Sequence, residues 1–302
     1  MTAFWGWVGA ILWMASAMLF TWYAIGVAQQ ITYVTLADGR KQERSIPLIF
    51  RLLLPLTPNV KGLMLSPRFE KLRAKTDGMI VTAGFEGLLE GWELLALKVV
   101  LPVCLGPLWC LILYQLGGAS EFPLRLFPIL SLLGVVFFYI YPVMWLRSAV
   151  KLRQNQILRA MPFVLDLLTL SVEAGLDFMS AVQRATEREK LDALSEELLR
   201  MVREIQVGTT RKNALRAMSE RVNLPDMRAL VNALVQADEL GVAVGSILRI
   251  QSDQIRVRRF ERAEKLANEA PTKLLGPLMV FIFPAVFIIL LGPLFYKLAA
   301  QV

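Results

Sequence analysis

The sequence predicts an all-α, polytopic membrane protein with about four transmembrane helices and a cytoplasmic helical bundle. Of its 302 residues, 56% are hydrophobic and 19% are charged, and the mean hydropathy is +0.52. This composition is too apolar for an ordinary soluble chain. Four stretches without a charged side chain are long enough to cross a bilayer, and between the third and the fourth apolar residues recur at helical spacing.

The four charge-free stretches comprise residues 4–28, 99–118, 126–146 and 274–296. At a rise of 1.5 Å per residue, about 20 residues cross a hydrocarbon core of roughly 30 Å. A cleaved secretory signal would begin with basic residues, whereas the first charged residue here is Asp38. The first stretch is therefore interpreted as a transmembrane helix.

The fourth stretch is the most apolar and also contains prolines. It holds fifteen Leu, Ile, Val or Phe residues, whose insertion contributes roughly 5 to 9 kcal/mol. Pro277, Pro284 and Pro293 would break a soluble helix, but in a membrane neighbouring groups satisfy the carbonyls that they free. We therefore expect a kinked transmembrane helix.

Basic residues predict the orientation. Residues 38–98 carry ten Lys or Arg and residues 147–273 carry twenty-one, whereas the link 119–125 carries one. Because basic segments stay on the cytoplasmic side, both large segments are expected there, with both termini periplasmic. The net charge of +8 then reflects topology. The expected segments are a transmembrane helix (1–37), a cytoplasmic loop with short helices (38–98), a transmembrane hairpin (99–146), a cytoplasmic bundle (147–273) and a last transmembrane helix (274–302).

The larger cytoplasmic segment shows the helical pattern most clearly. Large apolar residues follow one another at steps of three and four, at Leu191, Leu194, Leu198, Met201 and Ile205. Pro162 and Pro225 stand where helices favour a first-turn proline, and Gly175, Gly208 and Gly241 stand where helices favour a C-terminal glycine. The pattern predicts about six helices in short antiparallel hairpins.

A weak internal repeat supports two related hairpins. Glu173 with Gly175 and Glu239 with Gly241 each close one helix and precede another, 66 residues apart. A glutamate in a last helical turn opposes the helix dipole, so both suggest a pairing hypothesis. Chance similarity between two hairpins, and carboxylates that simply face water, remain the alternatives.

The loop of residues 38–98 suggests two features. Residues 48–54 have one charge, Arg51, among large apolar side chains, which is typical of an interfacial helix. A partly buried protein segment would show the same pattern. A hairpin is expected around Ala83 and Gly84.

Reactive motifs are missing. The chain has no histidine, and Cys104 and Cys110 lie in an apolar stretch without metal-ligand spacing. It has neither a phosphate-binding loop nor a nucleophile elbow. Glu196 and Glu197 diverge around a helix, which favours a solvated face over a catalytic dyad. We expect no enzymatic activity, no cofactor and no metal.

Other classes of partner and function also fit poorly. The bundle segment mixes 21 basic with 17 acidic residues and has few aromatic residues, so nucleic acid is not an expected partner. A channel or transporter is a poorer alternative because the four spans hold no charged residue. A membrane-anchored scaffold is a further alternative.

The last cytoplasmic helix, expected over residues 244–269, is rich in arginine. Arg256, Arg258, Arg259 and Arg262 lie in a helix that leads toward the fourth span. Such a helix could transmit movement of a cytoplasmic partner into the membrane. A solvated basic face placed by the topology rule is the alternative.

Residues 161–296 resemble the type II secretion system F domain, in the version found in tight-adherence (Tad) pilus platform proteins of the C type. The resemblance rests on Met-Pro at 161–162 before an apolar helix, Glu-Ala-Gly at 173–175 and Val-Gly-Thr at 207–209. Ala-Pro-Thr-Lys-Leu-Leu at 270–275, before a span that contains proline, points to the C type. Residues 1–150 match only in layout.

The resemblance implies a platform protein in the bacterial inner membrane. Such platforms lie over a cytoplasmic secretion ATPase and, with a B-type platform subunit, couple ATP turnover to lifting pilin out of the bilayer. Relatives in type II secretion have two F domains, whereas this chain shows one, which implies a homo- or hetero-oligomer.

Overall fold

The computed structural model describes residues 33–35, 41–43, 46–119, 127–186 and 192–299. The expected first span, residues 4–28, lies outside them. Apart from a short antiparallel pair of strands, β1 (Tyr33–Thr35) and β2 (Lys41–Glu43), the described chain is built of helices. The all-α fold class is confirmed, and the strand pair is an addition that the sequence pattern did not predict.

Residues 46–101 form a small module beside the membrane hairpin. It contains α2 (Leu48–Leu53), the 3-10 helix η1 (Leu54–Val60), α3 (Lys61–Met64), the 3-10 helix η2 (Pro67–Phe69) and α4 (Glu70–Ala83). Phe50 is fully buried against Trp145, with ring centroids 5.0 Å apart. As expected, a helical hairpin turns at Gly84, which is left-handed at φ 77°.

Two helices form the hairpin that enters the membrane. Helix α5 (Gly91–Ala119) begins where the Gly91 amide donates to the Asp77 carboxylate at 2.7 Å, and α6 (Phe127–Glu173) packs along it. The Trp109 indole crosses to α6 and donates to the Leu130 carbonyl at 3.2 Å. It lies over Gly134, where an added Cβ would meet the indole nitrogen at 2.2 Å. The two helices therefore approach closely at this point.

The bundle contains the C-terminal part of α6, then α7 (Phe178–Thr186), α8 (Ala193–Gln206), α9 (Arg211–Val222), α10 (Pro225–Leu240) and the start of α11 (Val244–Pro277). Its core unites apolar residues from all of these helices. In α8, Leu194, Leu198 and Met201 are buried, as the spacing of three and four predicts. Leu191 of that pattern lies outside the described residues.

Three predicted helix ends have left-handed glycines. Gly175, Gly208 and Gly241 have φ of 90°, 106° and 66°. After each glycine, the next amide donates to the carbonyl five residues back, as from Leu176 to Ser171 at 3.1 Å. Only glycine adopts this conformation without steric cost, so these stops follow from the sequence.

Both Pro162 and Pro225 were predicted to lie in the first turn of a helix. The prediction is confirmed for Pro225 and wrong for Pro162. Pro225 lies in the first turn of α10. Pro162 lies buried inside α6, which runs unbroken over 47 residues from Phe127 to Glu173. Proline lacks the amide hydrogen that an interior helix position uses, but tight packing in the core holds the helix together there. The two hairpins of the internal repeat therefore share the helix ends at Gly175 and Gly241 but differ in the positions of their prolines.

Helix α11 continues toward the last membrane segment as expected. A π-helical turn, η4 (Leu278–Ile282), joins it to α12 (Phe283–Ala299). This turn lies between Pro277 and Pro284, and its extra residue accommodates the proline that follows. At the prolines the chain thus departs from α-helical hydrogen bonding, and α12 continues past Pro293.

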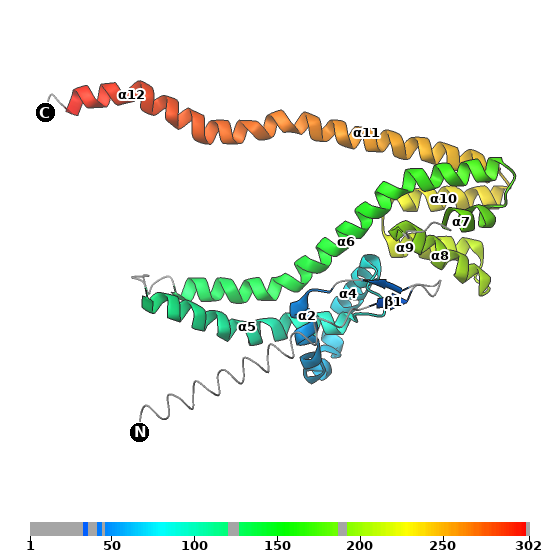
Figure 1. Ribbon diagram of the computed structural model, residues 1–302, viewed down its shortest axis with the longest axis horizontal. Coiled ribbons are helices and arrows are strands. Elements are labelled where there is room, and N and C mark those ends of the chain that lie inside the picture. Colours follow the sequence, from blue (N-terminus) through cyan, green and yellow to red (C-terminus); the bar gives the residue numbers. More distant parts are fainter. Residues whose placement is uncertain (1–32, 36–40, 44–45, 120–126, 187–191, 300–302) are drawn as a thin grey trace.

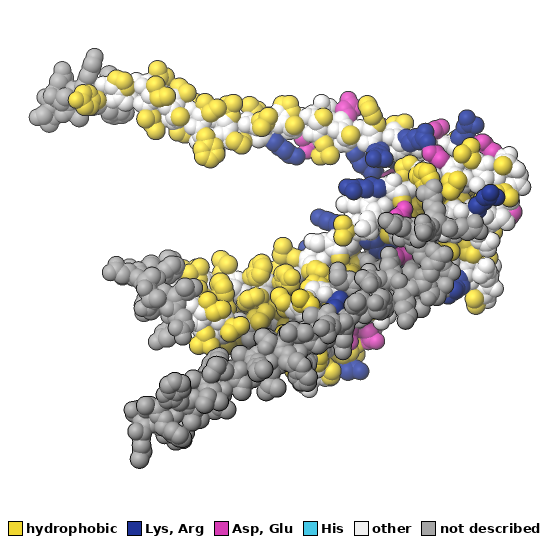
Figure 2. All heavy atoms as spheres, in the orientation of Figure 1, with side chains coloured by type: hydrophobic (Ala, Val, Ile, Leu, Met, Phe, Trp, Pro, Cys, Tyr) yellow, Lys and Arg dark blue, Asp and Glu magenta, His cyan; other side chains and the backbone are white. Residues whose placement is uncertain are grey.

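The apolar segments extend to one side of the molecule. Figure 1 shows the α5–α6 hairpin and α12 extending the same way from the bundle. Hydrophobic side chains cover both arms in Figure 2, whereas charged side chains gather over the bundle and the adjoining part of α11. Three described stretches are long and apolar enough to cross a membrane, within Gly91–Leu113, Phe127–Glu173 and Val244–Pro293. The chain is a multi-pass membrane protein.

Candidate functional site

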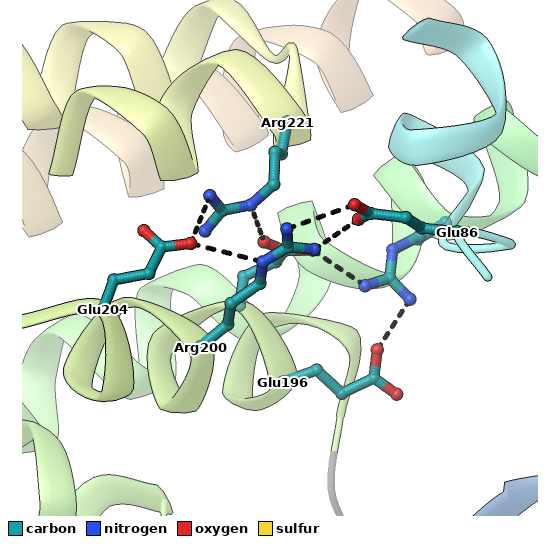
Figure 3. Close-up of polar contacts among 7 residues, drawn as sticks. Glu86, Glu196, Arg200, Glu204 and Arg221 are labelled. Atoms are coloured by element: carbon teal, nitrogen blue, oxygen red, sulfur yellow. Dashed lines mark hydrogen bonds and ion pairs between the residues drawn. The ribbon is translucent and has the colours of Figure 1, made fainter. Parts of the chain in front are cut away.

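The junction between the bundle and the membrane-side module holds a network of charged residues. It joins α6, α8, α9 and the turn that follows α4, through Glu86, Arg153, Glu196, Glu197, Arg200, Glu204 and Arg221. Figure 3 shows Arg200 between Glu86 and Glu204, with Arg221 reaching in from the opposite helix. We call these seven residues the junction network.

Arg153 of α6 holds the inner end of the junction network. Its guanidinium contacts Glu196 at 2.7 Å and Glu197 at 3.0 Å, and the exposed fractions of the three side chains are 9%, 5% and 7%. Glu197 also accepts from Arg221 of α9 at 3.0 Å. One side chain from the membrane-spanning helix is thus bound directly to α8 and, through Glu197, is linked to α9.

The interpretation of Glu196 and Glu197 as solvated carboxylates was wrong. Both are buried, and both contact Arg153. Adjacent carboxylates do diverge around a helix, but the crossing of α6 over α8 lets one arginine reach both. Two buried carboxylates that are held by arginines suit a structural junction better than proton transfer.

The outer end of the junction network is open to solvent. Arg200 binds Glu86 of the membrane-side module and contacts Glu204 at 3.3 Å. The hydrogen bond and charge of Arg200 lower the pKa of Glu86 from its usual value, and Glu86 in turn raises the pKa of Arg200. The pair therefore stays charged at neutral pH.

The predicted arginine cluster of α11 forms a second charged site, which we call the arginine clamp. Arg258 and Arg262 bind the Asp226 carboxylate at 2.7 and 2.6 Å. Arg256 pairs with Asp166 of α6, which also accepts from Ser252 at 2.6 Å. These contacts fix the start of α11 against α6 and α10.

Asp226 is the centre of the arginine clamp. Its side chain is only 6% exposed and lies in the first turn of α10. Burial alone would raise the pKa of Asp226, but hydrogen bonds from Arg262 and Arg258 and their charges together lower it. The carboxylate therefore stays ionised.

Arg259 differs from its three neighbours. It is exposed, and among the residues that the structure describes no ion pair joins it. Three of the four arginines of the predicted cluster thus bind acidic residues within the fold, and the fourth is exposed on the surface. The sequence placed all four on one helix but could not separate these roles, since their acidic partners lie far away in the chain.

The two glutamates of the internal repeat both have basic partners. Glu173 contacts Arg249 at 3.5 Å, and Glu239 contacts Lys212 at 2.5 Å. The hydrogen bond from Lys212 lowers the pKa of Glu239. All four side chains are largely exposed, so these contacts add little stability.

The described residues offer structural rather than reactive chemistry. Among them, no group of three or more His, Cys, Asp or Glu side chains could hold a metal ion. The space within the bundle is about 20 Å³, and apolar side chains such as Met161 and Leu248 line it. The two charged sites therefore position helices.

Residues 164–292 match the family model described as type II secretion system (T2SS), protein F. The match covers the last part of α6, all of α7 to α11 and η4, and the first part of α12. No curated protein and no solved structure matches the chain.

Proposed function

We propose that this chain is an inner-membrane platform protein of a tight-adherence (Tad) pilus or type II secretion machine, of the C type. In this proposal the bundle and the loop of residues 38–98 lie in the cytoplasm and both termini are periplasmic. The bundle binds a secretion ATPase, a B-type platform subunit completes the oligomer, and pilin is lifted from the bilayer. The domain match over residues 164–292 carries this proposal.

The unbroken α6 supports a mechanical role. One helix passes from the membrane hairpin into the bundle core, and the junction network binds it to α8 and α9. A helix held by packing and by buried ion pairs transmits displacement with little loss, because packed interiors have low compressibility. Movement of the bundle would thereby reach the α5–α6 hairpin.

The arginine residues of α11 have two roles in this proposal. Arg256, Arg258 and Arg262 position the domain through Asp166 and Asp226. Arg259 is exposed and makes no ion pair with the described residues, so it is the candidate for contact with an acidic face of the ATPase. Pro162, Gly175, Pro225 and Gly241 serve the fold of the bundle rather than a partner.

Affinity capture of the intact protein from mild detergent tests the function. We expect an ATPase and a related membrane subunit in the captured complex, and loss of surface fibres when the gene is deleted. A deletion strain that keeps its fibres would overturn the proposal. Solute flux through the purified protein in liposomes would instead favour a channel.

Arg259→Glu tests the contact. We expect it to remove the ATPase from the captured complex while the melting temperature and membrane insertion stay unchanged. Glu261→Gln, also exposed on α11, is the matched control. An unchanged ATPase yield with Arg259→Glu would exclude this contact.

A further inference from the structure

We propose that α2, η1 and α3 together form an interfacial membrane-binding surface that docks on anionic phospholipid headgroups. The surface consists of the exposed apolar residues Leu48, Ile49, Leu56, Leu63 and Leu65, with the basic residues Lys61 and Arg68 beside them. We call it the lipid-docking surface. This inference depends on membrane insertion of the chain and not on the proposed pilus function.

The segment has two apolar faces, and within the described residues one of them packs inside the protein while the other is exposed. Phe50 and Leu53 are buried in the module core, and Met64 packs on α5. Leu48 and Leu63, in contrast, are 60% and 64% exposed. A segment of 18 residues that buries one apolar face and exposes another needs a second apolar neighbour. The partly buried interpretation of residues 48–54 thus holds for one face, and the interfacial interpretation is what we propose for the other.

The position of the lipid-docking surface identifies this neighbour as the bilayer. Met64 contacts Leu95 and Ala96 of α5, and the Lys61 ammonium lies 5.1 Å from the centre of the Trp92 ring. The charge-free stretch of α5 begins at Val99, only a few residues further along. Since α5 enters the hydrocarbon there, the segment lies at the level of the headgroups. Figure 1 shows α2 beside the bundle-side end of α5.

Charge favours anionic headgroups over neutral ones. Residues 46–76 contain six Lys or Arg and a single acidic residue, Glu70. Lys61, Arg68, Lys71 and Lys75 are exposed. Each basic side chain near an anionic surface strengthens binding by about 1 kcal/mol, which is roughly fivefold. Apolar side chains between basic ones are the pattern of helices that lie in the membrane interface.

The segment lies on the membrane rather than across it. Leu48–Met64 and Pro67–Ala83 meet at an angle of 106° and together are long and apolar enough to form a broken span. The second part, however, carries Arg68, Lys71, Arg73, Lys75 and two acidic residues. Charges at this density are too costly for hydrocarbon, whereas headgroups accept them.

Depth-dependent fluorescence quenching of the full chain in vesicles tests the proposal. Cys104 and Cys110 are first replaced by alanine, and a cysteine for an environment-sensitive fluorophore is introduced as Leu63→Cys or Leu48→Cys. The protein is reconstituted in phosphatidylcholine vesicles with and without phosphatidylglycerol. Phospholipids brominated along the acyl chain quench the fluorophore only if it reaches the acyl region, and iodide quenches it only if it faces water.

Controls are available on the same chain. Leu111→Cys, in the charge-free part of α5, gives the signal of a label in lipid. Val207→Cys and Leu240→Cys give that of a label in water, because Val207 and Leu240 are apolar and 82% and 77% exposed on the bundle. Each labelled protein must melt at the temperature of its unlabelled parent, and the second docking position guards against a local defect at the first.

We expect brominated lipid to quench labels at Leu63 and Leu48 far more than labels at Val207, with iodide showing the reverse order. Phosphatidylglycerol should increase the lipid quenching. Reversing Lys61 and Arg68 to glutamate should abolish that increase, whereas reversing Arg184 and Arg203 on the bundle should not. The proposal is overturned if labels at Leu63 and Leu48 behave like the label at Val207, as they would if another protein covered this surface.

Discussion

Replacement of Arg153 by methionine is the sharpest test of the junction network. Arg153→Met keeps the length of the side chain but removes the charge that contacts Glu196 and Glu197. Glu197 keeps Arg221, whereas Glu196 loses the ion pair that it makes with Arg153. A carboxylate only 5% exposed would then lose the counter-charge that Arg153 provides.

Removal of one partner from a buried ion pair typically costs about 3–5 kcal/mol. For a domain of this size, each kcal/mol shifts the melting temperature by about 2–4 °C, so the expected fall is roughly 6–20 °C. Arg200→Met is the matched control, because Arg200 belongs to the same network with a side chain that is 39% exposed. Its loss should cost less than about 1 kcal/mol.

Thermal unfolding of the purified protein in detergent, followed by circular dichroism, measures both variants. The double variant Arg153→Met with Glu196→Met should recover most of the loss, since apolar side chains of similar volume can replace a buried pair at little cost. Equal melting temperatures for Arg153→Met and Arg200→Met would refute the reasoning that burial sets the strength of this network.

Three further predictions concern the arginine clamp, a helix end and acid. Asp226→Asn should weaken hydrogen-exchange protection at the start of α11, whereas Asp253→Asn, exposed on the same helix, should leave it unchanged. Gly175→Ala should destabilise the protein by about 1–2 kcal/mol in thermal unfolding, because its φ is 90°; Gly78→Ala, inside α4 with open space around it, should stabilise it by about 0.4–1 kcal/mol. Glu86 and Asp226 have lowered pKa values, so the stability that they contribute is complete above their usual pKa of about 4 and is lost as the pH falls through the lowered values. An acid titration of the melting temperature should show this loss in the wild type and less of it in Asp226→Asn.

Local rules predicted the parts of the fold that depend on neighbours in sequence. Gly175 and Gly241 end helices because a left-handed residue must stand there, and this requirement is visible in the chain itself. The position of Leu198 in the core follows from helical spacing in the same way. The prediction of membrane-spanning helices needed only the length and composition of the charge-free stretches.

The errors concern residues whose role depends on distant partners. Glu196 and Glu197 are buried because Arg153 lies 43 and 44 positions earlier in the chain and yet beside them in the fold. Pro162 is interior because α6 enters the bundle without a break, and a first-turn proline and a buried interior proline look alike in sequence. No local pattern contains either kind of information.

The two helices that join the bundle to the membrane, α6 and α11, differ in how much of their length packs against other helices. Helix α6 packs on α5, on α4 and on the bundle, and the indole of Trp109 covers its Gly134 within the hairpin. Helix α11 has no buried residue beyond Ile255, and Pro271, Pro277 and a π-helical turn follow before α12. A displaced bundle would therefore move the α5–α6 hairpin as one body, whereas the path to α12 lacks buried contacts and has fewer α-helical hydrogen bonds near these prolines. We therefore expect movement of the bundle to reach the hairpin more directly than it reaches α12.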